Sequence, residues 1–178
     1  MRCVTIIALV SDAPLEHKAH APHSVACFVL TVSDSRTKDT DTSGRAIRAL
    51  LEEAGHTVTG DAIVKDEPAQ VAAVVRAQLA DERTKVIITT GGTGISRRDG
   101  TFEAIHGLLE KRLDGFGELF RMLSFREIGS PAMMSRATAG TVGRKAIFVL
   151  PGSENAVRLA MTQLILPELG HVVQQLSR

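Results

Sequence analysis

The sequence contains no tryptophan and no tyrosine, and its aromatic rings are limited to six phenylalanines besides the histidines. A base-stacking platform of the kind that RNA-binding domains use is therefore disfavoured. The chain also lacks a charge imbalance, because its formal net charge is only +1. A nearly neutral protein has no general attraction to nucleic acid or to a membrane surface. We expect neither as a partner, and any anion site must be local.

Cysteines are equally few, with Cys3 and Cys27 as the only two. They form no CxxC pair, and two thiolates cannot complete a four-cysteine zinc site. We expect two reduced thiols in a cytoplasmic protein. The mostly apolar run at 4–10 is too short to cross a bilayer and about the shortest core that a secretory signal tolerates. We interpret residues 1–24 as a flexible N-terminal extension and residues 25–178 as a single domain.

Several catalytic signatures are missing. The chain has no GxSxG, no HExxH, and no lysine after a glycine as a P-loop requires. The dinucleotide fingerprint GxGxxG fails because Arg97 stands at its third glycine position. Neither cysteine has an evident histidine partner, so covalent catalysis is disfavoured. Phosphoryl or nucleotidyl transfer by positioning and electrostatics remains.

The pattern that is present alternates between strands and helices. An apolar, β-branched run at 24–33 predicts a buried strand. Residues 56–66 and a short apolar segment at 84–94 predict two more strands, and amphipathic segments between them predict helices. Segment 135–153 predicts two strands around a turn at Gly143–Arg144, and a long helix, bent at Pro167, follows from about 153 to 175. This order predicts an α/β fold with a mainly parallel sheet covered by helices on both faces.

Polar or glycine-rich segments follow four of the predicted strands. They are residues 33–37, 65–68, 89–101 and 151–156. Ligands in such sheets bind at the carboxyl ends of the strands, so we expect these four segments to form one crevice.

The segment TTGGTGISRRDGT, residues 89–101, has the strongest functional pattern. Gly91, Gly92 and Gly94 allow positive φ angles and let backbone N–H groups approach a ligand. Such a turn before a helix makes a nest for an anion such as phosphate. The alternative is a tight strand-to-helix turn without a ligand.

Charged residues near this loop allow two interpretations each. Arg97 and Arg98 can pair with phosphate or lie in solvent. Asp99 and Asp66 can cap helices. A carboxylate beside phosphate is repelled unless a cation intervenes, so the same pair can instead hold Mg²⁺. Ser153 either caps the last helix or leaves its first N–H groups to an anion.

Five ordered motifs together carry a family resemblance. They are LTVSDSRTKDTDTSG, IVKDEP, TTGGTGISRRDGTFEAI, GFGELFRMLSFREIGSPAMMSRATAG and FVLPGSENAV. The chain resembles the MoaB/MogA family of molybdenum cofactor biosynthesis proteins from about residue 25 onward, and it is more similar to the MoaB branch. Gly100 departs from the family pattern, in which a branched residue is commoner. The resemblance implies a three-layer α/β/α sandwich with a mostly parallel sheet.

The resemblance also implies a reaction, the transfer of AMP from ATP to molybdopterin, which yields adenylyl-molybdopterin and pyrophosphate. It implies Mg²⁺ as cofactor and Asp66 and Asp99 as catalytic and metal-binding residues. It assigns ligand binding to Asp34, Ser43, Thr90, Gly91, Gly92, Thr93, Gly94, Arg98, Pro151, Gly152 and Ser153. It further implies a trimer or hexamer and a hand-over of product to a molybdate-insertion enzyme. The alternatives are a non-catalytic molybdopterin-binding or carrier protein, and a domain that keeps the fold for assembly alone.

Overall fold

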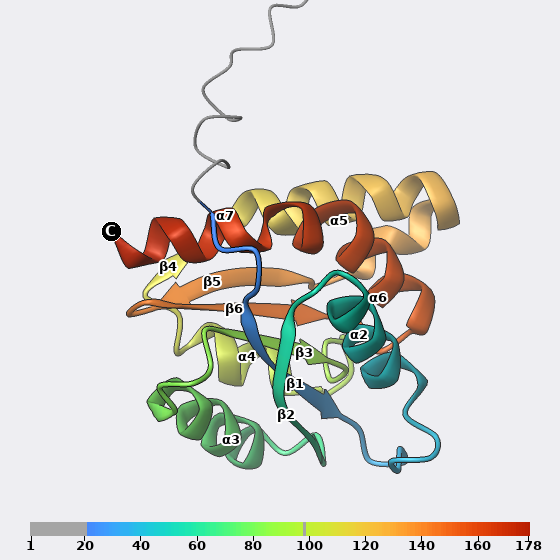
Figure 1. Cartoon of the computed structure of the whole chain (residues 1–178). Coiled ribbons are helices and arrows are strands. Elements are labelled where there is room, and N and C mark those ends of the chain that lie inside the picture. The colour runs from blue at the N-terminus through green and yellow to red at the C-terminus, as the bar shows by residue number, and fades with distance from the viewer. Residues whose placement is uncertain (1–20, 98) are drawn as a thin grey trace, which may run out of the picture.

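The computed structural model describes residues 21–97 and 99–178, and in them a central sheet lies between two layers of helices (Figure 1). The strands are β1 (Ala26–Val32), β2 (Thr57–Val64), β3 (Val86–Thr90), β4 (Lys111–Arg112), β5 (Thr138–Val142) and β6 (Lys145–Leu150). The helices are α2 (Thr42–Glu53), α3 (Pro68–Ala80), α4 (Thr101–His106), α5 (Asp114–Ile128), α6 (Glu154–Ala160) and α7 (Leu166–Ser177). A 3₁₀ turn, η1 (Ser130–Met134), follows α5, and a π-helical turn, η2 (Met161–Ile165), joins α6 to α7.

The sheet has the order β2-β1-β3-β6-β5-β4. Strands β2, β1, β3 and β6 are parallel, whereas β5 is antiparallel to β6 and to β4. The mostly parallel α/β sandwich is therefore confirmed, and with it the turn at Gly143, where φ is 54°. One consequence matters for the site: because β5 runs backwards, the residues before it lie at the edge where the parallel strands end.

Each face of the sheet carries its own hydrophobic core, since side chains alternate along a strand. Val29, Ile88 and Phe148 point to the face covered by α2, α5, α6 and α7. Leu30, Ile87 and Ile147 point to the opposite face, covered by α3 and α4. Cys27 lies in the first core as a free thiol, and burial raises its pKa to about 12, which makes it a packing residue and not a nucleophile. Cys3 lies outside the described residues.

Most helix expectations are confirmed. Pro68 begins α3, and Gly55, with φ of 81°, follows the end of α2. The third helix is shorter than its apolar pattern indicates, because α4 ends at His106 and Leu108 packs from the turn that follows. The expected bend near Pro167 corresponds to the π-helical turn η2, which lies immediately before α7.

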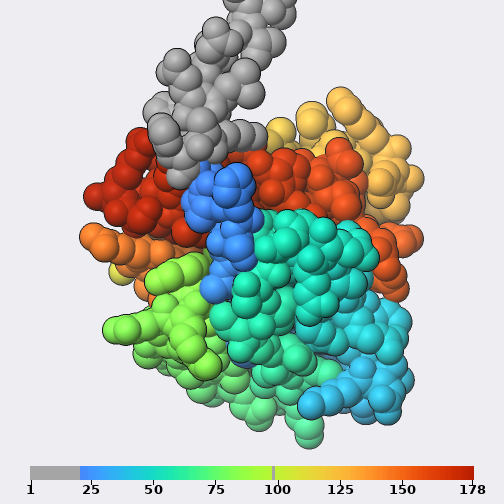
Figure 2. Space-filling model, in the orientation of Figure 1, coloured from blue at the N-terminus to red at the C-terminus, as the bar shows by residue number. Residues whose placement is uncertain are grey.

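The start of the described chain packs on the last helix. Figure 2 shows the segment after residue 20 at the surface, beside the C-terminal helix. A Cβ on Gly170 would lie 2.7 Å from the carbonyl oxygen of Pro22, so this contact requires a glycine in α7. The rest of the expected extension, residues 1–20, lies outside the described residues. No helix in the described ranges is long and apolar enough to cross a membrane.

Candidate active site

The four polar segments meet at the carboxyl edge of the sheet, as the sequence predicts. The Gly91 N–H donates to the carbonyl of Leu150 (3.1 Å), and Thr90 Oγ1 donates to the carbonyl of Pro151 (2.9 Å). These bonds join the loop after β3 to the loop after β6. The Ser33 N–H bonds the carbonyl of Val64 (2.8 Å), which joins the loops after β1 and β2.

The glycines of the loop make room for the protein's own atoms. Gly91 and Gly92 have φ angles of 98° and 63°, as expected, but Gly94 has no positive φ. A Cβ on Gly91 would lie 2.1 Å from the carbonyl oxygen of Val32. A Cβ on Gly92 would lie 2.8 Å from Asp66 Oδ1. The glycines are therefore needed for close packing of backbone and carboxylate, whether or not a ligand is bound.

Asp66 does not cap α3, although it stands just before that helix. Glu67 occupies the N-cap position of α3 without a side-chain bond. Asp66 Oδ1 instead accepts hydrogen bonds from Thr101 Oγ1 (3.0 Å) and from the Gly100 N–H (3.4 Å). Asp66 is only 7% exposed. Its carboxylate therefore fixes the start of α4 and lies against the glycine-rich loop.

Asp99 does not cap its helix either. Gly100 is the N-cap of α4, and it offers no side chain. Asp99 Oδ2 accepts the Ser96 N–H (2.9 Å), and a Cβ on Gly94 would lie 2.5 Å from the same oxygen. Asp99 thus closes the loop on itself and faces its glycines. Both candidate catalytic aspartates therefore belong to one loop assembly.

These two carboxylates have the chemistry that a Mg²⁺ ion requires. Each uses one oxygen in the loop, and the second oxygen of each has no hydrogen bond to a described residue. Mg²⁺ commonly takes one or two carboxylates and completes its shell with water and substrate phosphate oxygens. The described residues contain no group of three or more acidic, histidine or cysteine side chains that could hold a metal. Asp66 and Asp99 therefore fit a metal shared with substrate, and not one enclosed by protein alone.

Arg136 is the main site residue that the sequence reasoning missed. It lies just before β5, and its guanidinium donates to the carbonyls of Thr93 (3.0 Å), Gly94 and Asp99. It also pairs with Glu103 of α4 and lies over the ring of Phe102, 4.9 Å from its centroid. One side chain thus holds the loop and α4 together.

The pKa of Glu103 reflects this pairing. Desolvation alone would raise it, but the hydrogen bond and charge of Arg136 lower it below its usual value. The order of strands could have revealed Arg136: a segment that precedes an antiparallel strand returns to the carboxyl edge of its parallel neighbours.

A cavity of about 320 Å³ lies beside this loop, and we call it the loop cavity. Thr93 and Gly94 form one wall, and Pro151, Gly152 and Ser153 form another. The remaining lining is mostly apolar and comes from α5, η1 and α6: Phe120, Ser124, Ile128, Pro131, Ala132, Met134, Ser135 and Ala156. A polar loop next to an apolar pocket suits a ligand with a flat ring and an anionic group.

The other expected site residues are distributed unevenly. Ser153 Oγ accepts the Ala156 N–H (3.3 Å), so it caps α6 while it lines the loop cavity. Ser43 is buried in the first turn of α2, where its hydroxyl bonds Asp41 Oδ1 (3.3 Å), and Asp34 is exposed on the loop after β1. Neither Ser43 nor Asp34 lines the loop cavity. Arg97 is exposed, and Arg98 lies outside the described residues.

Known proteins place this arrangement in a family. Residues 28–171 match the family model described as "Probable molybdopterin binding domain". Molybdenum cofactor biosynthesis protein B of Bacillus anthracis is 55% identical over 164 residues, which cover 92% of this chain and 97% of that protein. The chain belongs to the MoaB/MogA family of molybdenum cofactor biosynthesis proteins.

Solved structures of the MoaB/MogA family agree in fold. A crystal structure of molybdenum cofactor biosynthesis protein B has a TM-score of 0.86 at 54% identity and covers 89% of this chain and 99% of its own. The tungsten cofactor synthesizing protein MoaB of Pyrococcus furiosus has a TM-score of 0.79 at 34% identity and covers 89% of this chain and 100% of its own. A MogA structure is 28% identical with a TM-score of 0.78 and covers 85% of this chain and 99% of its own. These identities favour the MoaB branch.

Proposed function

We propose that this member of the MoaB/MogA family is a molybdopterin adenylyltransferase. It transfers AMP from ATP to the terminal phosphate of molybdopterin and releases pyrophosphate. The observation that carries the proposal is the pair Asp66 and Asp99. Each has one carboxylate oxygen held in the glycine-rich loop assembly and one oxygen without a hydrogen bond to any described residue. An anion-binding protein without chemistry has little use for two carboxylates beside its loop.

In the proposed reaction, an oxygen of the pterin phosphate attacks the α-phosphorus of ATP. The bond from the α-phosphorus to the bridging oxygen of the β-phosphate breaks, and pyrophosphate leaves with that electron pair. Both reactants are polyanions, so they repel one another and must also be aligned. Mg²⁺, when bound by Asp66 and Asp99, would neutralise charge on the phosphates.

The chain's own groups account for the rest of the site. The loop cavity offers apolar walls for a ring system and the Thr93–Gly94 and Pro151–Ser153 segments for polar contacts. Thr90 and Arg136 hold the loop in shape through the carbonyls of Pro151 and Thr93. A preformed loop costs less reorganisation when the charged ligands bind.

The direct test is an assay with ATP and molybdopterin, with and without Mg²⁺, that measures adenylyl-molybdopterin. We expect product only with the metal present. Turnover in EDTA-treated buffer would overturn the Mg²⁺ assignment. Molybdopterin binding without turnover under all conditions would favour the carrier protein, and the absence of any molybdopterin binding would favour a domain kept for assembly.

Assembly and partners stay predictions. A trimer or hexamer would need a surface to bury, and Leu119, Met122, Phe125 and Ile128 on α5 are each 45–59% exposed. A monomeric mass in analytical ultracentrifugation at micromolar concentration would contradict the homo-oligomer. Hand-over to a molybdate-insertion enzyme is tested by measuring product transfer between the two purified proteins. Free product is trapped, so that only direct transfer is counted.

A further inference from the structure

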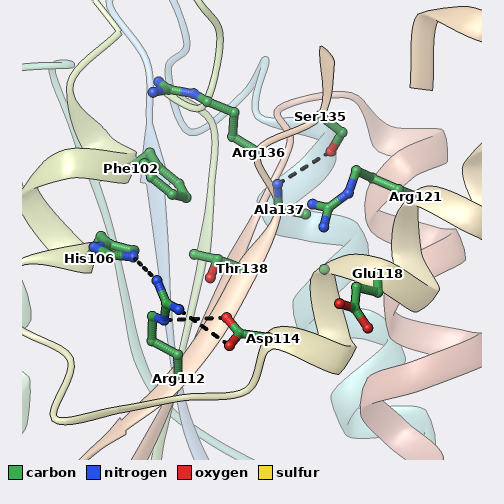
Figure 3. Close-up of a pocket in the computed structure, with 11 residues that line it drawn as sticks. Phe102, His106, Arg112, Asp114, Glu118, Arg121, Ser135, Arg136, Ala137 and Thr138 are labelled. Carbon is green, nitrogen blue, oxygen red and sulfur yellow. Dashed lines mark hydrogen bonds and ion pairs between the residues drawn. The ribbon is translucent and has the colours of Figure 1, made fainter. Parts of the chain in front are cut away.

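A second cavity, of about 390 Å³, has Arg136 in its lining (Figure 3). We call it the α4–α5 cavity. Its lining comes from α4, β4, the first half of α5 and the segment that enters β5: Phe102, His106, Arg112, Asp114, Gly117, Glu118, Arg121, Ser135, Arg136, Ala137 and Thr138. None of these residues is among those that the family resemblance assigned to ligands. The cavity borders the candidate active site, because Ser135 also lines the loop cavity and Arg136 holds the glycine-rich loop.

Three arginines line this cavity, and the guanidinium groups of two of them already have partners. Arg112 pairs with Asp114 (Nε to Oδ1, 3.3 Å) and lies 3.4 Å from His106 Nε2. Arg136 pairs with Glu103 and donates to three loop carbonyls. Figure 3 shows the first of these groups, with Arg112 between His106 and Asp114 on one side of the cavity.

Arg121 is different. It is partly buried, and it makes no hydrogen bond or ion pair with any described residue. A guanidinium presents five N–H donors in a planar fork that matches the oxygens of phosphate or carboxylate. Ser135 and Thr138 bring hydroxyl groups to the same cavity.

The position of Arg121 depends on a glycine one turn earlier. A Cβ on Gly117 would lie 3.0 Å from Arg121 Nη1 and 2.7 Å from the carbonyl oxygen of Ala137. The guanidinium therefore lies across the bare backbone of α5 and against the segment that enters β5. A side chain at position 117 would press on both the Ala137 carbonyl and this guanidinium, so the glycine leaves room for the present position of Arg121.

We propose that the α4–α5 cavity is a phosphate-binding subsite with Arg121 as its principal donor, next to the transfer site. This assignment rests on the proposed adenylyl transfer for its ligand, which is a phosphate group of one of the two substrates. The two sources are the β,γ-phosphates of ATP and the phosphate of molybdopterin. Glu118, the one carboxylate of the cavity that pairs with no cation among the described residues, lies on the same helix face and opposes the anion.

The probe for the first experiment is inorganic pyrophosphate, titrated into the full chain by isothermal calorimetry without nucleotide. We expect Arg121→Gln to weaken binding by roughly tenfold or more, since a charge-assisted bidentate contact is lost. Arg126→Gln is the matched control: it removes the same charge from the same helix, but Arg126 does not line the cavity. Equal weakening by both variants, or no effect of Arg121→Gln, would overturn the subsite, as would wild-type protein that binds no pyrophosphate.

Two further variants separate a binding role from a folding role. Gly117→Ala keeps every charge, but its methyl group would press on the Ala137 carbonyl and on the Arg121 guanidinium, so pyrophosphate binding should weaken. Glu118→Gln removes the opposing carboxylate, so binding should tighten by a fewfold while the thermal midpoint stays close to wild type. Weaker pyrophosphate binding in Glu118→Gln would contradict the proposal, because the carboxylate would then support the anion and not oppose it. This test stands even if Gly117→Ala fails to fold.

Competition identifies the source of the phosphate. If a non-hydrolysable ATP analogue displaces pyrophosphate and AMP does not, the subsite holds the triphosphate tail. If molybdopterin displaces it and the ATP analogue does not, the subsite holds the pterin phosphate. Displacement by neither would overturn the proposal. Wild-type protein that binds pyrophosphate through Arg121 but makes no adenylyl-molybdopterin would refute the proposed reaction and leave the anion subsite intact.

Discussion

Two cationic side chains donate hydrogen bonds to several backbone carbonyl groups, and they do so at opposite edges of the sheet. At the amino edge, Lys145 Nζ donates to the carbonyls of Gln78 (3.0 Å) and Asp81, at the end of α3. At the carboxyl edge, Arg136 donates to the carbonyls of Thr93, Gly94 and Asp99. Lys145 binds carbonyl groups at the C-terminal end of α3, and most helices end without such a side chain. Arg136 shapes a segment that has no regular structure.

The two cations therefore differ in what they hold, a helix end for Lys145 and an irregular loop at the site for Arg136. Burial lowers the pKa of Lys145, as expected for an ammonium that is desolvated by a structural contact. Arg136 instead lines the α4–α5 cavity and donates to the carbonyls of Thr93 and Asp99, in the loop that borders the loop cavity. Hydrogen bonds from a cation to backbone carbonyls therefore stabilise the fold at one edge and, on our proposal, position the ligand at the other.

The largest predicted effect comes from the aspartates of the carboxyl edge. Asp99→Asn and Asp66→Asn should each lower adenylyl transfer by roughly 10²–10³-fold or more, because metal and phosphate lose a charged ligand. Asp81→Asn, which removes a partly buried carboxylate paired with Arg83 at the amino edge, should leave turnover unchanged. Steady-state rates at saturating Mg²⁺ decide this, and near wild-type turnover in both site variants would remove the metal role.

The two cations themselves give the next prediction. Arg136→Met should lower turnover by roughly tenfold to a hundredfold, since a loop shifted by about 1 Å misaligns the reactants. Lys145→Met should leave turnover unchanged and destabilise the fold by about 1 kcal/mol, because two partly buried carbonyls lose a donor. Paired kinetics and urea unfolding measure both. Equal effects of the two variants on turnover would mean that Arg136 positions the site no more than Lys145 does.

A pair of glycines sharpens the comparison further. Gly91 at the carboxyl edge and Gly55 at the amino edge both have positive φ, 98° and 81°. A Cβ would collide with the Val32 carbonyl at position 91 but meets nothing within 4 Å at position 55. Gly55→Ala should cost about 1 kcal/mol, and Gly91→Ala should cost clearly more and lower turnover. Thermal unfolding that ranks the two equally would show that the loop relaxes around the added methyl.

The smallest effect concerns His56 at the amino edge, where its Nδ1 accepts the Val25 N–H (3.2 Å). Desolvation lowers its pKa below 6.5. The unfolded chain then binds more protons, so this contribution is complete above pH 6.5 and is lost as pH falls through the lowered pKa. His56→Gln keeps an acceptor without a titrating group, and its stability should fall less than that of wild type between pH 7.5 and 5. Urea unfolding at the two pH values measures this. An equal loss of unfolding free energy in the variant and in wild type would contradict it.

Local sequence was sufficient to predict much of this molecule. Alternating apolar strands and amphipathic helices required a covered parallel sheet, and the polar segments after four strands had to share one edge. The helix starts at Pro68 and the stop at Gly55 follow from backbone chemistry alone. Motif order was enough to identify the MoaB/MogA family.

Tertiary structure decided what local patterns leave open. Asp66 and Asp99 both looked like helix caps, and only packing shows that they bind the loop and the start of α4 instead. Arg136 was invisible as a site residue because it lies 37 residues along the chain from Asp99, whose carbonyl it reaches. The turn at Gly143–Arg144 already predicts that β5 runs against β6, but only the packed structure shows which loop carbonyls the Arg136 side chain then reaches. The sequence by itself thus determined which segments meet, whereas the fold determined which atoms of those segments have partners and which remain available to a ligand.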